Sequence, residues 1–175
     1  MAENDPAFRR VASAAHADLF TLAPSLGSKG GTPWRVGIQH PRAAAPLATL
    51  ELRDGEAIGT SGDYQRYFEV DGKRYCHLLD PRSGRPAEGT QAVTVLIAPR
   101  PDAPQGYFLR GAGALSDAAS KPLFVAGPAE WRGLARRLGV EQALRIDAAG
   151  AMQVTAALRQ RLTLLAKDVP VADLP

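Results

Sequence analysis

The side chains most capable of chemistry lie close together in the sequence, between Thr60 and Gly84. They include neighbouring hydroxyls at Thr60 and Ser61 and an imidazole at His77, separated by alternating aromatic and apolar residues that are typical of strands. This pattern can place polar groups at strand ends facing one cleft. From the residues alone, His77 is either a general base or a histidine hydrogen-bonded between sheet and loop. The segment Thr60-Ser-Gly62 either contacts a ligand or belongs to an ordinary turn, for which Ser-Gly-Asp is a common sequence.

The elements that position these side chains are expected to be strands. The dipeptide Asp71-Gly72 is a strong hairpin signal, and it joins a strand expected over residues 64–70 to one over residues 73–79. Residues 93–98 are apolar throughout and predict a buried central strand. Further strands are expected over residues 34–38, 48–52, 57–61, 143–146 and 151–154.

Helical spacing of apolar residues predicts helices over residues 5–16, 116–125, 130–138 and 156–167. Pro122 predicts a kink in the second helix, and Gly139 predicts the end of the third. Strands and helices together predict an α+β fold in which helices pack on an antiparallel-rich sheet. A chain of 175 residues fits one domain, which we place at residues 1–167, followed by a flexible tail over residues 168–175.

The charged, apolar and cysteine residues of the sequence argue against several classes of function. Lys and Arg together number 21 against 18 for Asp and Glu, and the basic residues are scattered, which argues against a nucleic-acid partner. No apolar run reaches the length of a membrane-spanning helix, so no membrane association is expected. We see no export signal and expect a cytoplasmic protein, or a periplasmic one if a leader precedes this sequence. The single cysteine, Cys76, allows no internal disulfide.

Several motifs, in one order from about Leu19 to about Leu162, resemble the C-terminal half of the ApbE family, the FAD:protein FMN transferases, whose domain is related to the T-fold. They are Gly31-Thr-Pro-Trp-Arg-Val-Gly-Ile-Gln-His-Pro41, Thr60-Ser-Gly-Asp-Tyr64, Asp71-Gly-Lys-Arg-Tyr75, His77-Leu-Leu-Asp-Pro-Arg-Ser-Gly84, Val93-Thr-Val95, Ser116-Asp-Ala118 and Leu123-Phe-Val-Ala-Gly127.

This resemblance implies a magnesium-dependent enzyme that splits the pyrophosphate of FAD and joins FMN through a phosphoester to a threonine or serine of a target protein. It implies that His77 is catalytic and contacts the cofactor. It also implies cofactor contacts for Thr60, Ser61 and Gly62, and a metal-ligand role for Asp117. Asp80 is interpreted as a turn residue or as a support for the site.

The chain also departs from the family pattern. Lys121 stands where the resemblance places a threonine or serine that gives the metal a second oxygen, and an ammonium group cannot ligate magnesium. Lys121 lies one helical turn after Asp117, so an ion pair between them is expected, with Ser120 as the alternative source of a hydroxyl. The upstream half of the family's domain is expected to be missing.

We therefore expect transferase activity to be weak or lost. The alternative hypothesis is a pseudoenzyme: a non-catalytic module that binds a flavin nucleotide or serves as a scaffold. Such a module would form a homodimer, or would pair with a partner that supplies the missing half.

Overall fold

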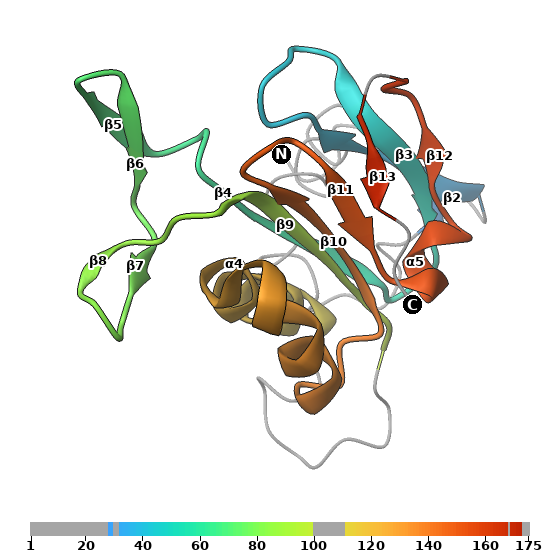
Figure 1. Ribbon diagram of the computed structural model, residues 1–175. Coiled ribbons are helices and arrows are strands. Elements are labelled where there is room, and N and C mark those ends of the chain that lie inside the picture. The colour runs from blue at the N-terminus through green and yellow to red at the C-terminus, as the bar shows by residue number, and fades with distance from the viewer. Residues whose placement is uncertain (1–27, 30–31, 100–110, 168, 173–175) are drawn as a thin grey trace, which may run out of the picture.

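The computed structural model describes residues 28–29, 32–99, 111–167 and 169–172 (Figure 1). One sheet has the order β1-β2-β3-β12, formed by β1 (Ser28–Lys29), β2 (Thr32–Gln39), β3 (Pro46–Leu52) and β12 (Thr163–Leu164). The other has the order β13-β11-β10-β9-β4, formed by β13 (Val171–Ala172), β11 (Met152–Val154), β10 (Gln142–Asp147), β9 (Thr90–Ile97) and β4 (Ala57–Gly62). Only the β11–β13 pair is parallel among the described strands. The antiparallel-rich α+β prediction is confirmed.

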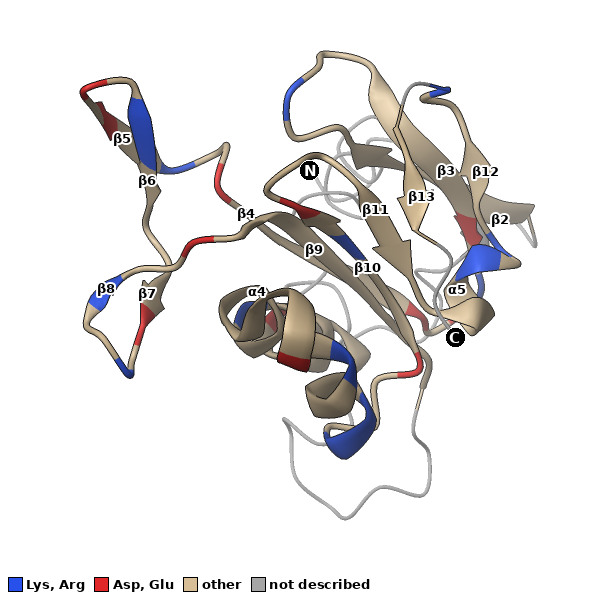
Figure 2. Ribbon diagram, in the orientation of Figure 1, with Lys and Arg blue, Asp and Glu red and all other residues tan. Residues whose placement is uncertain are grey.

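Two small hairpins project from this body as an arm, which we define as residues 67–86 (Figure 1). It consists of β5 (Tyr67–Val70), β6 (Lys73–Cys76), β7 (Leu79–Asp80) and β8 (Arg85–Pro86). The predicted hairpin turn is present, with φ values of 51° at Asp71 and 73° at Gly72, although β5 and β6 are shorter than the strands expected. The arm contains both basic and acidic residues (Figure 2).

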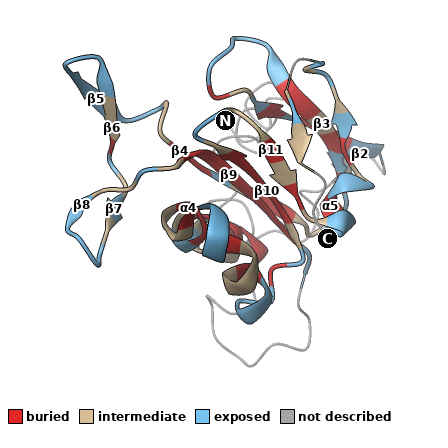
Figure 3. Cartoon of the chain, viewed as in Figure 1, coloured by how far each residue is buried: buried red, intermediate tan, exposed pale blue. Residues whose placement is uncertain are grey.

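The core explains why β9 is buried along its whole length. Ala92 and Leu96 face the four-stranded sheet and pack with residues such as Leu50, whereas Val93 and Val95 belong to the second core cluster beneath the long helix. The sequence of a strand that is covered on both faces is apolar throughout, because neither face contacts water. The predicted buried central strand is thus confirmed, and Figure 3 shows the buried centre of this sheet beside the largely exposed arm.

The long helix, α4 (Ala112–Arg137), combines the second and third helices that we predicted. Its break lies at Gly127, which has φ 69° and ψ −173°, and not at Pro122, where we expected a kink. Pro122 has a φ compatible with a helix and removes one hydrogen bond, whereas Gly127 leaves the helical region altogether. Pro128 then starts the second segment, and Gly139, with φ 65°, follows its end as predicted.

The helix expected over residues 156–167 is wrong beyond its first turn. Only α5 (Ala156–Arg159) is helical, and Thr163–Leu164 instead pair with Thr49 and Ala48 at the edge of the four-stranded sheet. Sheet pairing there overrides local helix propensity. Within the segment that we expected to be a flexible tail, Val171–Ala172 form β13 and pair with β11. The helix predicted over residues 5–16 lies outside the described residues.

None of the helices that the structure describes is both long enough and apolar enough to cross a membrane.

Candidate functional site

Strand β4 and helix α4 approach each other at Gly59. A Cβ at this position would lie 2.6 Å from the carbonyl carbon of Ser116 and 2.7 Å from the backbone nitrogen of Asp117. Glycine is therefore required for α4 to lie directly on β4. Ser61 points to the same face two residues later, and its Oγ lies 2.7 Å from the Oγ of Ser120. This contact places Ser61, one of the predicted site residues, beside the helical turn that contains Asp117.

The other two residues of the predicted cofactor-binding segment lie differently. Strand alternation turns Thr60 to the opposite face from Ser61, where its Oγ1 lies 2.9 Å from the Oγ1 of Thr94. Gly62 lies against the ring of Tyr64, so any side chain at Gly62 would collide with that ring. Burial raises the pKa of the Tyr64 phenol. Of Thr60, Ser61 and Gly62, Ser61 is therefore the residue whose side chain contacts α4.

The expected ion pair between Asp117 and Lys121 is present. The Nζ of Lys121 lies 2.5 Å from Oδ1 of Asp117 and also donates to the backbone oxygen of Asp117 at 3.2 Å. The same backbone oxygen accepts a hydrogen bond from Ser120 Oγ at 2.8 Å. Within the helical turn from Asp117 to Lys121, the side chains of Ser120 and Lys121 therefore bind oxygen atoms of Asp117.

These contacts test whether the turn fits the magnesium ion that the family resemblance implies. Magnesium binds oxygen ligands in near-ideal octahedral geometry. In this turn a carboxylate oxygen is already paired with an ammonium group. The described part of the chain also contains no group of three or more His, Cys, Asp or Glu side chains that could hold a metal ion. The residues present do not fit a magnesium ion at Asp117.

His77 follows β6 at the base of the arm, and its side chain is exposed. Its backbone nitrogen and its Nδ1 both contact the backbone oxygen of Arg66, at 3.2 and 3.1 Å. A carbonyl oxygen can only accept a hydrogen bond, so Nδ1 must carry the proton and Nε2 is left with a free lone pair in the neutral ring. Nε2 is therefore free to act as a general base.

The structure does not bring all predicted site residues together. Among the described residues, the hydrogen bonds of His77 reach only Arg66, and none joins it to Asp117. Asp80 has the turn role that we expected, because its Oδ1 accepts from the backbone nitrogen of Arg82 at 2.9 Å. Its carboxylate also accepts from the guanidinium of Arg82, and this hydrogen bond lowers the pKa of Asp80.

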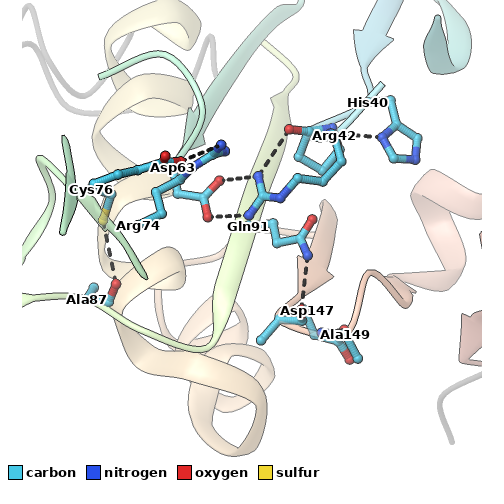
Figure 4. Close-up of polar contacts among 12 residues, drawn as sticks. His40, Arg42, Asp63, Arg74, Cys76, Ala87, Gln91, Asp147 and Ala149 are labelled. Carbon is cyan, nitrogen blue, oxygen red and sulfur yellow. Dashed lines mark hydrogen bonds and ion pairs between the residues drawn. The ribbon is translucent and has the colours of Figure 1, made fainter. Parts of the chain in front are cut away.

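One ion pair beside this region was missed from the sequence. The guanidinium of Arg42 donates to both oxygens of Asp63, at 2.7 and 2.6 Å, and Figure 4 shows the two groups facing each other. The hydrogen bond to Asp63 raises the pKa of Arg42. It ties the chain just after Gly62 to the loop between β2 and β3. The partners are 21 positions apart, so no local pattern indicates the pair.

Comparisons with known proteins agree with one another. The model of the ApbE family matches residues 21–144. A "FAD:protein FMN transferase" of Rhodobacter capsulatus is 40% identical over 154 residues, which are 86% of this chain and 27% of the relative. The protein of the same name from Escherichia coli K12 is 35% identical over 128 residues, which are 70% of this chain and 33% of the relative. This chain thus spans about a third or less of these relatives.

Two solved structures of similar proteins also match most of this chain but less than half of their own length. The ApbE protein of Thermotoga maritima superposes with a TM-score of 0.63 at 32% identity, over 78% of this chain and 40% of that one. The apo form of the Pseudomonas stutzeri flavinyl transferase ApbE gives a TM-score of 0.55 at 36% identity, over 77% of this chain and 38% of that one.

Proposed function

This chain belongs to the ApbE family, and from that membership we propose that it is an FAD:protein FMN transferase-like protein that binds FAD. The reaction for which such a site is built is transfer of FMN from FAD to a threonine or serine hydroxyl of a target protein. Because the carboxylate of Asp117 is paired with the ammonium of Lys121, we propose that transferase activity at this site is weak or lost.

The observation that carries this proposal is the hydrogen bonding of His77. Since Nδ1 of His77 donates its hydrogen to the backbone oxygen of Arg66, Nε2 is available to accept the proton of an attacking hydroxyl. In the proposed step, the hydroxyl oxygen forms a bond to the FMN-side phosphorus of FAD. The bond from that phosphorus to the bridging oxygen breaks, and AMP leaves with the electron pair. The hydroxyl proton moves to Nε2 of His77.

Other residues of the site would bind or position the nucleotide. We propose that Ser61 and Gly62 lie near the cofactor, with Thr60 as a further contact through its backbone, since its hydroxyl is bonded to Thr94. Because Asp117 is paired with Lys121, no step is assigned to a magnesium ion. Without a metal to offset the charge of the pyrophosphate, the transfer step has little electrostatic stabilisation, which is the physical reason for weak activity.

Two measurements test this proposal. Titration of FAD with the chain, followed by flavin fluorescence, should show saturable binding. Incubation with FAD, magnesium and a threonine-containing acceptor peptide should give at most a trace of peptide carrying FMN by mass spectrometry, and H77Q should remove that trace. Robust transfer would contradict the weak activity, and an absence of FAD binding would contradict the proposed function itself.

The arm favours the non-catalytic module as a second candidate. Its side chains Phe68, Val70 and Leu79 are 58%, 49% and 57% exposed, and a two-stranded hairpin alone is only marginally stable in water. A partner that covers these side chains, such as a second copy of this chain, would stabilise the arm. Light scattering after size exclusion should then show a dimer that F68S weakens. A monomer at high protein concentration would contradict self-association.

A further inference from the structure

Three oxygen atoms of the Asp117 turn have partners within the chain. Asp117 Oδ1 is paired with Lys121 Nζ, and the backbone oxygen of Asp117 accepts from both Lys121 and Ser120. The Ser120 hydroxyl gives its hydrogen to that backbone oxygen and lies 2.7 Å from the hydroxyl of Ser61. A divalent cation would have to compete with Lys121, Ser120 and Ser61 for these three oxygen atoms.

The turn nevertheless contains a positive charge. Lys121 is a unit charge beside the carboxylate, and its side chain is 45% exposed, so that a ligand can reach it. An ammonium group has three hydrogens to donate, and Asp117 takes two of them. Among the described residues no other group accepts the third hydrogen. Lysine is a well-suited phosphate ligand because its ammonium acts as a compact point charge.

We propose that the ammonium of Lys121 takes the place of a divalent cation at Asp117, so that this chain binds the phosphates of a flavin nucleotide without a metal. This inference rests on the proposed function, because it names how the same site would hold FAD. Lys121 would offset the charge of Asp117, which otherwise repels phosphate, and would donate its remaining hydrogen to a phosphate oxygen.

The charge balance also sets the expected strength of binding. A carboxylate with a divalent cation has one net positive charge, whereas Asp117 with Lys121 has none. Phosphate is thus accepted but attracted less strongly, which agrees with the weak activity proposed above. The same balance predicts that adding magnesium will not improve FAD binding, because the place of the metal is already filled.

Binding of manganese, followed by the loss of its free electron paramagnetic resonance signal, tests the metal half of the proposal. The chain itself should show no saturable binding at millimolar manganese. K121T removes the ammonium and supplies a hydroxyl one turn from Asp117, so its manganese affinity should rise by about tenfold or more. K121M removes the charge without adding an oxygen and should gain less. K167T, a lysine change on an exposed residue outside α4, is the matched control and should behave like the unchanged chain.

FAD fluorescence titrations test the nucleotide half. The affinity of the unchanged chain should be the same in EDTA and in magnesium, and K121M should weaken it in both. K121T should bind FAD better in magnesium than in EDTA. Tight manganese binding by the unchanged chain, or FAD binding that EDTA abolishes, would overturn the inference.

The two experiments also separate this inference from the proposed function. If FAD fails to bind under either condition, the proposed function fails, and the phosphate role of Lys121 fails with it. The manganese results then still decide whether Lys121 excludes a metal. Because the unchanged chain is measured in both experiments, the inference can be overturned even where a variant fails to fold.

Discussion

The hydroxyls of Ser61 and Ser120 lie 2.7 Å apart, and this hydrogen bond joins the end of β4 to α4. Both residues are buried. Since the hydroxyl hydrogen of Ser120 goes to the backbone oxygen of Asp117, Ser61 is the donor in the bond between the two hydroxyls. The contact therefore holds the Asp117 turn in a fixed position against the strand that carries the predicted cofactor-binding residues.

Replacement of these two serines by alanine should reveal their coupling. We expect S61A and S120A each to lower the free energy of unfolding by about 1 kcal/mol, because each removes a buried hydrogen bond. The double variant should lose less than the sum of the two single variants, since the shared bond can be lost only once. Urea unfolding of all four proteins measures this difference. Strictly additive effects would contradict a direct bond.

The close approach at Gly59 gives a second prediction. G59A should lower the free energy of unfolding by about 1–3 kcal/mol, because its Cβ would meet backbone atoms of Ser116 and Asp117 that cannot easily move. G37A is the matched control, since a Cβ there would be 3.7 Å from the Cβ of Pro46, an ordinary contact. Thermal unfolding compares the two. If both variants lost the same free energy of unfolding, the loss in G59A would come from strand propensity and not from contact with α4.

Features of the fold that depend on neighbouring residues could be predicted from the sequence. The turn at Asp71-Gly72 and the ion pair of Asp117 with Lys121 both form between residues at most four positions apart, so spacing alone indicates them. The end of α5 could not be predicted in this way. The residues after Arg159 have no strong helix breaker, and they leave the helix because Thr163–Leu164 find a sheet edge that is distant in sequence.

The site was predictable to a similar extent. The sequence indicates that Thr60 and Ser61 alternate between faces, but not which face α4 covers; Gly59 decides that through its contact with Ser116. The free nitrogen of His77 likewise depends on the carbonyl of Arg66, which lies 11 positions away across the base of the arm. Such contacts are set by packing, and packing between distant segments has no local sequence pattern.

Arg145 supports a third prediction, because its side chain is fully buried. Its guanidinium donates to the backbone oxygen of Gly89, to Oγ1 of Thr90 and to Oε1 of Gln153. Burial lowers the pKa of this guanidinium. R145M should lower the free energy of unfolding by about 2 kcal/mol or more, since it leaves the Gly89 carbonyl without this donor.

The matched control for R145M is the same substitution at an exposed arginine, Arg137. Arg137, in the last turn of α4, is exposed, and R137M should change stability by no more than about 0.5 kcal/mol. Chemical unfolding of both variants gives the comparison. If R145M were as stable as R137M, the hydrogen bonds of Arg145 would be shown to contribute no net stability, and the arginine would be replaceable by any side chain of similar volume.

Two ion pairs make the arm and its junction with the body sensitive to acid. The hydrogen bond from Arg82 lowers the pKa of Asp80 below its ordinary value of 3.8, and that from Lys73 lowers the pKa of Glu88 below 4.5. Both carboxylates bind protons more weakly in the folded chain than in the unfolded chain. Their stabilisation is therefore complete above those ordinary values and is lost as the pH falls through the lowered values.

Acidification should thus loosen the arm before the body. We expect amide resonances of β5 and β6 to shift and broaden between about pH 5 and about pH 3, while those of β9, buried on both faces, stay unchanged. All four side chains of the ion pairs have exposed surface, so salt should weaken the effect by screening them. E88Q removes one pair and should loosen the arm already at neutral pH, whereas D54N, a carboxylate outside the arm, should not. Arm and β9 signals that change together would show global acid unfolding, because the local ion pairs would then have no separate role in holding the arm.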